Sequence, residues 1–321
     1  MSERMKIVKI ALWWFGIVLA IVLPFLLPKD YHVHMLVLAG IYSILALSLG
    51  LIMGFTGQVS LCHAAFYGIG AYTSSLLALN WDWPFWISLW VGAIGAGFVS
   101  FLLGCLVLRL KGHFLAITTA FFGIFVALLF NNLTELTKGP MGLPGIPRPA
   151  SIDLGFLKID FITRTSYYYL VLCFAGFAGY CIYRLIHSRF GQAMIAIREN
   201  EELSQSIGVN SMKIKLLSFT VGGMFAGLAG AIYAHYILFI SPVSFTLAES
   251  INILTMVIFG GMQSFWGPIV GSFLLTILPE FLRMAGELRM TLYGLALMLL
   301  IIFLPSGLVC SIKEKWFSPS K

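Results

Sequence analysis

The sequence has few charged residues and none of the common motifs of nucleotide, zinc or serine-nucleophile chemistry. Asp, Glu, Lys and Arg make up only 10% of its 321 residues, whereas soluble domains carry roughly 25%. It contains no G-x-x-x-x-G-K-[ST] phosphate loop, no H-E-x-x-H motif and no G-x-S-x-G motif. Its six histidines are scattered along the chain. These absences argue against an enzyme, and we expect no catalytic residue, metal or other cofactor.

Paired cysteines are also missing. None of the five cysteines belongs to a C-x-x-C pair, and most lie in apolar runs. They are therefore interpreted as small buried hydrophobic residues rather than as a disulfide or metal framework. They are Cys62, Cys105, Cys173, Cys181 and Cys310.

Long apolar runs dominate what is present. Hydrophobic residues make up 60% of the chain, and the mean hydropathy is +0.95. The runs are longer than strands need and do not alternate, which excludes a β-barrel. The composition predicts an all-α integral membrane protein, a polytopic helical bundle folded as one transmembrane domain over 1–321. The net charge of +7 comes from basic loops and does not indicate nucleic acid.

Ten apolar runs are predicted to span the bilayer, some of them broken by glycine. The first resembles a signal peptide, but no A-x-A cleavage site follows it, so we expect an uncleaved helix. The eighth and ninth runs could instead be shorter broken helices. The predicted spans are 10–28, 33–53, 63–79, 84–108, 113–130, 167–187, 212–240, 248–260, 266–283 and 290–308.

Basic residues gather in four segments, which sets the expected orientation. Cytoplasmic loops are enriched in Lys and Arg, and ten spans place all four segments on the cytoplasmic side, together with both termini. The four groups are Arg4, Lys6 and Lys9; Arg109 and Lys111; Arg184, Arg189, Arg198, Lys213 and Lys215; and Lys313, Lys315 and Lys321.

Residues 188–210 form the most polar long segment. Asn200 can cap a helix that begins with two glutamates, and Gly208 can end it. Leu203 and Ile207 are four residues apart and would project from one side of this two-turn helix. Such a helix is suited to seat in another protein, although an ordinary solvated loop is an equally good interpretation.

The predicted outer segment 131–166 contains the Gly/Pro cluster GPMGLPGIPRP, from Gly139 to Pro149. Its four prolines and three glycines exclude a regular helix. The segment is either a plain connector or an external face that a donor protein contacts.

Two uncharged glycine breaks interrupt apolar runs near the cytoplasmic side, Gly54–Ser60 and Gly260–Ser264. Broken helices free backbone groups that protein, water or substrate must satisfy, and in transporters they point to the pathway. Close helix packing is the alternative explanation. The candidate residues for the substrate path are Gly57, Gln58, Ser60, Gly260, Gly261 and Ser264.

Small residues recur at helical spacing and predict close contact between helices. One stripe comprises Gly92, Ala96, Ser100 and Gly104, a second Gly222, Ala226 and Gly230, and a third Gly223, Gly227 and Ala231.

Few charges lie inside the predicted spans, and Glu249 and Glu280 fall near span ends. Ion-coupled carriers usually hold ionisable groups at mid-membrane, so ion coupling is disfavoured. A channel remains open, but a simple pore needs no docking helix.

The run from Gly54 to Tyr72, GFTGQVSLCHAAFYGIGAY, resembles the signature of branched-chain amino acid ABC transporter permeases of the LivM type. That family usually has Gly where this chain has Cys62. Four further segments agree in order: Gly142–Pro149, Ala196–Asn210, Phe259–Ser272 and Tyr293–Leu308.

The resemblance implies a coupling helix that fits a cleft in an ATPase. Its E-A-A-x-x-x-G motif is degenerate here, because Glu202 and Gly208 keep the spacing while Leu203 and Ser204 replace the alanines. The residues expected to couple to the ATPase are Arg198, Glu201, Glu202, Leu203, Ile207 and Gly208.

The resemblance also implies the partners: a second related permease, two ATP-binding subunits that hydrolyse ATP, and an external or periplasmic binding protein. The expected substrates are leucine, isoleucine and valine, moved by alternating access across a bacterial inner membrane. A urea or short-chain amide permease has a similar pattern and remains an alternative.

Overall fold

The computed structural model of the protein describes residues 22–24, 30–153, 158–282, 288, 291–292, 294–295, 298–299, 302 and 307–311. Helices account for most of these residues. The α-helices are α2 (Asp30–Gly50), α3 (His63–Asn80), α4 (Phe85–Val107), α5 (His113–Asn132), α6 (Thr134–Thr137), α7 (Arg164–Ile186), α8 (Arg189–Glu199), α9 (Glu201–Ser206), α10 (Ser211–Ile237), α11 (Leu247–Gly260) and α12 (Trp266–Phe281). A π-helical turn, η1 (Leu51–Phe55), extends α2, and 3-10 turns form η2 (Gly139–Met141) and η3 (Pro242–Phe245).

Four two-residue strands complete the described secondary structure. Strand β1 (Leu143–Pro144) pairs antiparallel with β4 (Phe239–Ile240), with Leu143 opposite Ile240. Strand β2 (Ile152–Asp153) pairs antiparallel with β3 (Lys158–Ile159). The β1–β4 pair ties the predicted outer segment to the end of α10. As predicted, no α-helix passes through the Gly/Pro cluster 139–149.

Five of the described helices are long and apolar enough to cross a membrane. They are the continuous helix Asp30–Phe55 together with α4, α5, α7 and α10. The protein is therefore a multi-pass membrane protein. Helix α11 has 14 residues and α12 has 16, which gives lengths of about 21 and 24 Å at 1.5 Å per residue. Both are shorter than the roughly 30 Å hydrocarbon core, as expected for the broken-helix alternative.

The predicted count of ten spans is only partly matched by these helices. The runs predicted at 33–53, 63–79, 84–108, 113–130, 167–187 and 212–240 correspond to helices whose ends differ by up to three residues, apart from the π-helical extension of the first. The predicted span 10–28 lies almost wholly outside the described residues, and only scattered residues of 290–308 are described.

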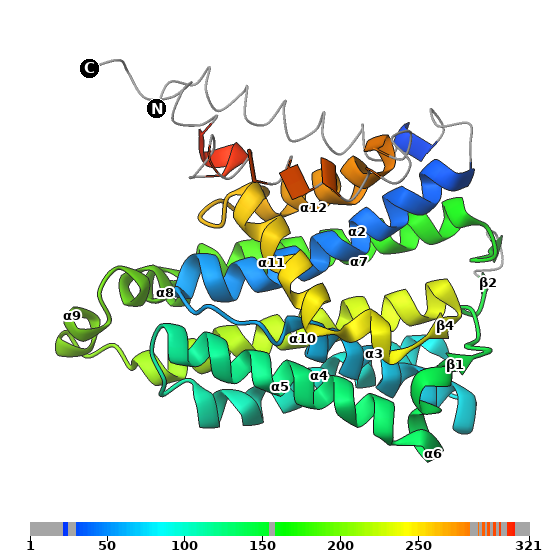
Figure 1. Ribbon diagram of the computed structural model, residues 1–321, viewed down its shortest axis with the longest axis horizontal. Helices are drawn as coiled ribbons and strands as arrows, with labels where there is room; N and C mark the ends of the chain where they lie inside the picture. The colour runs from blue at the N-terminus through cyan, green and yellow to red at the C-terminus, as the bar shows by residue number, and fades with distance from the viewer. Residues whose placement is uncertain are drawn as a thin grey trace.

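The helices pack in two groups (Figure 1). One group contains α2, α7, α11 and α12, and the other contains α3, α4, α5 and α10. Contact between α2 and α10 joins the groups. Helix α10 contacts α3 and α4 most extensively, so it organises the second group.

The predicted small-residue stripes lie at these α3–α4–α10 contacts. A Cβ atom added to Gly227 would lie 2.3 Å from the Cβ of Ala96, and one added to Gly230 would lie 1.9 Å from the Tyr67 carbonyl oxygen. The absence of side chains therefore lets the helix backbones approach each other closely, as the stripes predict.

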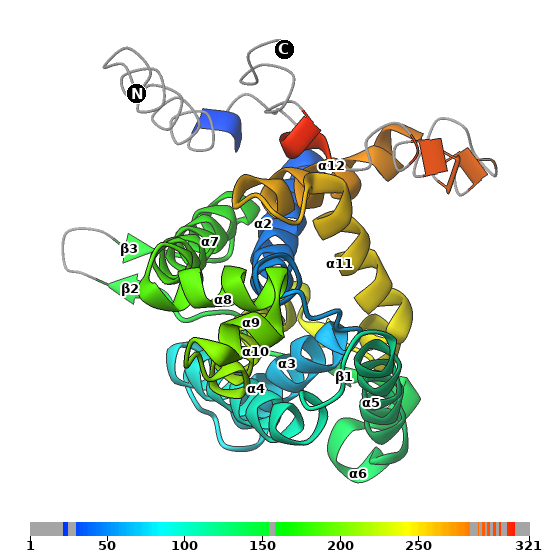
Figure 2. The same cartoon turned by 90° about the vertical axis from the view of Figure 1, so that its left-hand side faces the viewer.

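The two ends of the bundle differ in structure. Helices α8 and α9 lie at one end, while β1, β2 and β4 lie at the other (Figure 1). Figure 2 views the molecule from the α8–α9 end. The turn between α4 and α5 is also at this end, because Lys111 pairs with Glu202. Two predicted cytoplasmic basic segments thus share one end of the bundle.

Candidate functional site

Helix α9 begins and ends where the sequence predicts. The Asn200 side-chain oxygen accepts a hydrogen bond of 3.0 Å from the Leu203 backbone N–H, which is an N-cap interaction. Gly208 has a φ angle of +90°, a left-handed conformation that suits glycine after a helix. The helix itself is six residues long, so it needs the rest of the protein to hold it.

Part of that support is α8, a helix that the sequence analysis did not predict. Met194 and Ile197 are buried beneath it, and Gly191 packs against the backbone of Ile186. Their spacing of three residues is the signal that would have predicted this helix. The polar segment 188–210 is therefore two consecutive helices.

An ion pair ties α9 to α10. The Lys215 ammonium lies 2.7 Å from a Glu201 carboxylate oxygen, and the pair is largely buried. The Lys111–Glu202 pair is longer, at 3.7 Å, and exposed, so it contributes little to stability. Glu201 thus positions the helix, whereas Glu202 lies free at the surface apart from this weak pair.

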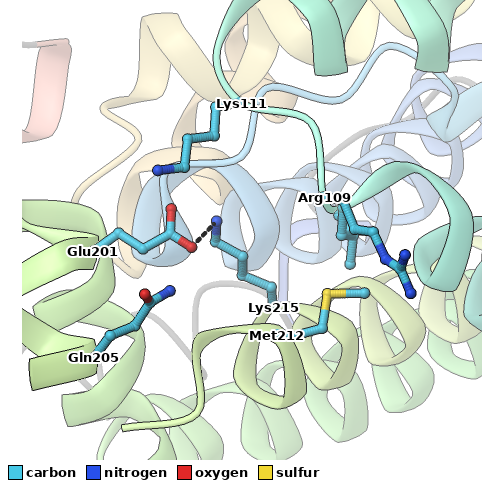
Figure 3. Close-up of a pocket in the computed structure, with 7 residues that line it drawn as sticks. Arg109, Lys111, Glu201, Gln205, Met212 and Lys215 are labelled. Carbon is cyan, nitrogen blue, oxygen red and sulfur yellow. Dashed lines mark hydrogen bonds and ion pairs between the residues drawn. The ribbon is translucent and has the colours of Figure 1, made fainter.

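A cavity of about 430 Å³ separates α9 from the α4–α5 turn. Figure 3 shows Lys111 and Lys215 on the side of the Glu201 carboxylate, while the Arg109 guanidinium points away. The cavity is lined by Leu108, Arg109, Lys111, Glu201, Gln205, Met212 and Lys215.

The apolar pair on α9 faces outward. Leu203 is 63% exposed and Ile207 is 75% exposed. Neither residue is needed to fill a core in this chain. They are thus available to a partner, and their role in docking stays a prediction.

The first glycine break is a segment that turns back into the protein. After the π-helical turn Leu51–Phe55, residues 57–62 are non-helical, and α3 begins beside α2 rather than at the end of the bundle. His63 Nε2 lies 2.7 Å from Ser48 Oγ, in the last turn of α2. We call residues 56–62 the re-entrant segment.

Neighbouring helices satisfy part of this buried backbone. The Leu61 N–H donates to Thr119 Oγ1 of α5 at 3.1 Å. The Ala64 N–H donates to Ser250 Oγ of α11 at 3.0 Å. Irregular backbone at membrane depth requires such internal partners.

The predicted path residues in this segment are buried. Gln58 is 3% exposed, and neither atom of its amide has a hydrogen-bond partner among the described residues. Ser60 is fully buried and lies 3.3 Å from Cys62 Sγ. Gly57 has a φ angle of +72°, which favours glycine. Gln58 is the residue of this set that packing does not explain.

The second glycine break is tightly packed. A Cβ atom on Gly260 would lie 1.8 Å from the Gly267 carbonyl oxygen, and Gly261 has a φ angle of +107°. Ser264 is half-buried in the turn, and its N–H donates to Gly261. Close packing is sufficient to explain both glycines, which leaves Ser264 as the polar candidate here.

The structure brings the two breaks together. A Cβ atom on Gly54 would lie 1.8 Å from the Met262 carbonyl oxygen, so the turn before the re-entrant segment rests on the second break. The spacing of residues along the chain contains no sign of this contact.

Arg198 joins the first break to the helices of segment 188–210. Its Nη1 donates to the Gly54 carbonyl oxygen at 2.7 Å, and its Nη2 lies 2.5 Å from Glu199 Oε1. A Cβ atom on Gly57 would lie 3.0 Å from Arg198 Cγ. The arginine therefore connects α8, next to α9, with the start of the re-entrant segment. This arrangement can pass a displacement of the helices to both glycine breaks.

Comparisons with known proteins identify the family of this chain. The family model described as "Branched-chain amino acid transport system / permease component" matches residues 31–304. The high-affinity branched-chain amino acid transport system permease protein LivM of Escherichia coli K12 is 37% identical over 311 residues, which cover 91% of this chain and 73% of that protein.

A more distant relative is the permease protein LivH of Salmonella typhimurium, 22% identical over 290 residues, which cover 85% of this chain and 92% of that protein. No solved structure matches the chain. The match over residues 31–304 and the identity to LivM show that this chain belongs to the family of permease components of branched-chain amino acid transport systems.

Proposed function

We propose that this chain is a permease subunit of an ATP-binding-cassette importer that moves leucine, isoleucine and valine across a bacterial inner membrane. The permease role follows from family membership. The substrates are proposed from the printed names of the LivM relatives. The structural observation that carries the mechanism is the Arg198 bridge between α8 and the first glycine break, which packs against the second through Gly54 and Met262.

The mechanism begins at α9. We expect an ATPase subunit to bind the exposed Leu203 and Ile207, with Glu202 and Gly208 at the edges of the contact. Closure of two ATPases on ATP would push α9, and Glu201–Lys215 would move α10 with it. Arg198 would carry the same movement to Gly54 and Gly57. The re-entrant segment and the Gly260–Ser264 turn would then open or close the cytoplasmic side of the path.

The complete transporter would contain three kinds of partner. A second permease is supported by the similarity of this chain to both LivM and LivH proteins. The ATPase subunits and an external binding protein that delivers substrate are proposed from the ABC assignment. The external face would be the outer segment 131–166, which β1 holds against the end of α10.

The deciding experiment measures uptake of labelled leucine and labelled urea in cells with and without this chain, before and after ATP depletion. We expect the chain to be required for ATP-dependent leucine uptake. Loss of urea uptake alone would assign the chain to the urea or amide branch. Uptake that persists after ATP depletion would contradict the coupling role and favour a channel or ion-coupled carrier.

A further inference from the structure

Glu249 is an acidic residue within an apolar helix. It is the third residue of α11, and the ion pairs found among the described residues do not include it. Its Oε1 atom is buried and has no hydrogen-bond partner in the part of the chain that the structure describes. A buried carboxylate without a cation is costly in a membrane protein, so its presence points to a function.

The surroundings of Glu249 are polar and come from several helices. Tyr42 of α2 and Asn252 of α11 hydrogen-bond to its carboxylate. Tyr233 of α10 is an electrostatic neighbour of Glu249, and its hydroxyl is hydrogen-bonded to Ser244 of η3. We call these five residues, Tyr42, Tyr233, Ser244, Glu249 and Asn252, the Glu249 crevice.

Each residue of the Glu249 crevice is partly exposed. The adjacent apolar residues are closed off, since Phe245 is 1% exposed and Ile253 is fully buried. The polar side chains are thus partly accessible, whereas the apolar side chains beside them are covered. This is the composition of small-molecule sites, which are apolar with a few convergent polar groups.

The crevice lies halfway along the bundle. Tyr42 is the thirteenth of the 26 residues of the continuous helix Asp30–Phe55. Ser250, next to Glu249, accepts the Ala64 N–H at the start of α3. Two helices, α3 and α11, therefore begin inside the protein at this level. Transporter substrates bind near the midplane at such helix starts.

The N-terminus of α11 stabilises the negative charge of the Glu249 carboxylate when no substrate is bound. The positive end of the helix dipole stabilises a negative charge in the first turn, and two donors add to it. Oε1 nevertheless keeps its hydrogen-bonding capacity unused. A cationic group entering the crevice would find an acceptor and two tyrosine rings, and ammonium groups bind favourably to both.

We propose that the Glu249 crevice binds the α-ammonium group of the amino acid as it passes through this chain. The inference rests on the proposed function, because it takes the substrate to be an amino acid. Glu249 accepts hydrogen bonds from the ammonium, and Tyr42 and Tyr233 face it with their rings and hydroxyls.

The first test compares Glu249→Gln with the wild type in the complete transporter reconstituted in liposomes with loaded binding protein. We expect initial leucine uptake to fall about tenfold or more, as for loss of a hydrogen bond to a charged group, with ATP hydrolysis retained. Glu249→Asp should recover most of the loss. The matched control is Glu280→Gln, which changes another acid of an apolar helix and should leave uptake unchanged.

The second test measures binding directly, by thermal stabilisation of the complex without binding protein. Leucine and 3-methylbutylamine should stabilise the wild type, whereas 4-methylpentanoate, which lacks the amino group, should not. Glu249→Gln should abolish the effect. Equal stabilisation of wild type and Glu249→Gln, or by the acid analogue, would overturn the ammonium site.

The two proposals fail in different ways. A wild-type complex that shows no ATP-dependent leucine uptake would overturn the proposed function. Normal uptake by Glu249→Gln in an otherwise active transporter would overturn only the ammonium site. Should Glu249→Gln not assemble, Tyr233→Phe and Asn252→Leu replace it, and an unchanged KM for leucine in both would also overturn the site.

Discussion

Arg198 belongs to the predicted coupling residues and also contacts the predicted substrate path. It donates to the Gly54 carbonyl oxygen, pairs with Glu199 and packs against Gly57. A guanidinium can make these contacts together because its donors form a planar fork. A lysine would keep the charge but lose the fork.

We expect Arg198→Ala to uncouple ATP hydrolysis from transport. Leucine uptake should fall about tenfold or more, because a charge-assisted hydrogen bond is lost, while ATPase activity persists. Leucine uptake by Arg198→Lys should lie between that of the wild type and that of Arg198→Ala. The measurement is leucine transported per ATP hydrolysed, with exposed Arg189→Ala on α8 as control. An unchanged ratio in Arg198→Ala would remove the arginine from the coupling route.

A substitution of Gln58 can distinguish a role in packing from a role in transport. Its buried amide has no partner among the described residues, so Gln58→Leu should leave the melting temperature equal or higher, since an unsatisfied buried amide costs about 1–3 kcal/mol. Uptake should nevertheless fall if the amide lines the path. Thr276→Val, which removes another unpartnered buried atom, is the control. Normal uptake by Gln58→Leu would end its assignment to the path.

At the scale of elements, the proposed docking surface of α9 consists of exposed residues that do not support the fold. Leu203→Asp combined with Ile207→Asp should change the unfolding free energy by less than about 0.5 kcal/mol per site, because both residues are exposed. The variant should no longer retain ATPase subunits in co-purification. Met141→Asp, at an 86% exposed apolar residue of η2, should retain them. Retention by the double variant would contradict docking at α9.

The sequence predicts local elements well and distant contacts poorly. The cap at Asn200 and the stop at Gly208 were predictable because capping involves residues a few positions apart. The small-residue stripes predicted close helix packing for a similar reason. The Arg198–Gly54 bond spans 144 positions and ends on a backbone carbonyl, which any residue type supplies. No residue pattern could reveal it.

Other differences come from length and burial. Helix α8 was missed although six of its eleven residues are apolar, because its Arg, Gln and Glu residues place it in the most polar long segment of the chain. The sequence places Glu249 near the end of a span. The hydrophobic pattern shows where α11 begins along the chain, but it does not show that α11 begins inside the bundle. The predicted path residues at Gly260 and Gly261 have a sufficient explanation in packing. Their role in transport stays a prediction.

At the scale of the whole molecule, the two ends of the bundle should face opposite sides of the membrane. A membrane-impermeant maleimide added to intact cells should label Met141→Cys and spare Ser206→Cys, in a background without the five native cysteines. Disrupted cells should label both, because Met141 and Ser206 are exposed. Labelling of Ser206→Cys in intact cells would reverse the orientation.

The re-entrant segment also constrains the order in which the protein can mature. Its backbone is held by Thr119, and the flanking residues Gly54 and Ala64 are held by Arg198 and Ser250. All three partners leave the ribosome after the segment. Until α11 has been made, the Ala64 N–H cannot donate its hydrogen bond to the Ser250 hydroxyl. Bilayer hydrocarbon contains no acceptor that could replace this hydroxyl. The segment is therefore synthesised before its partners and is among the last parts of the chain to reach its final conformation.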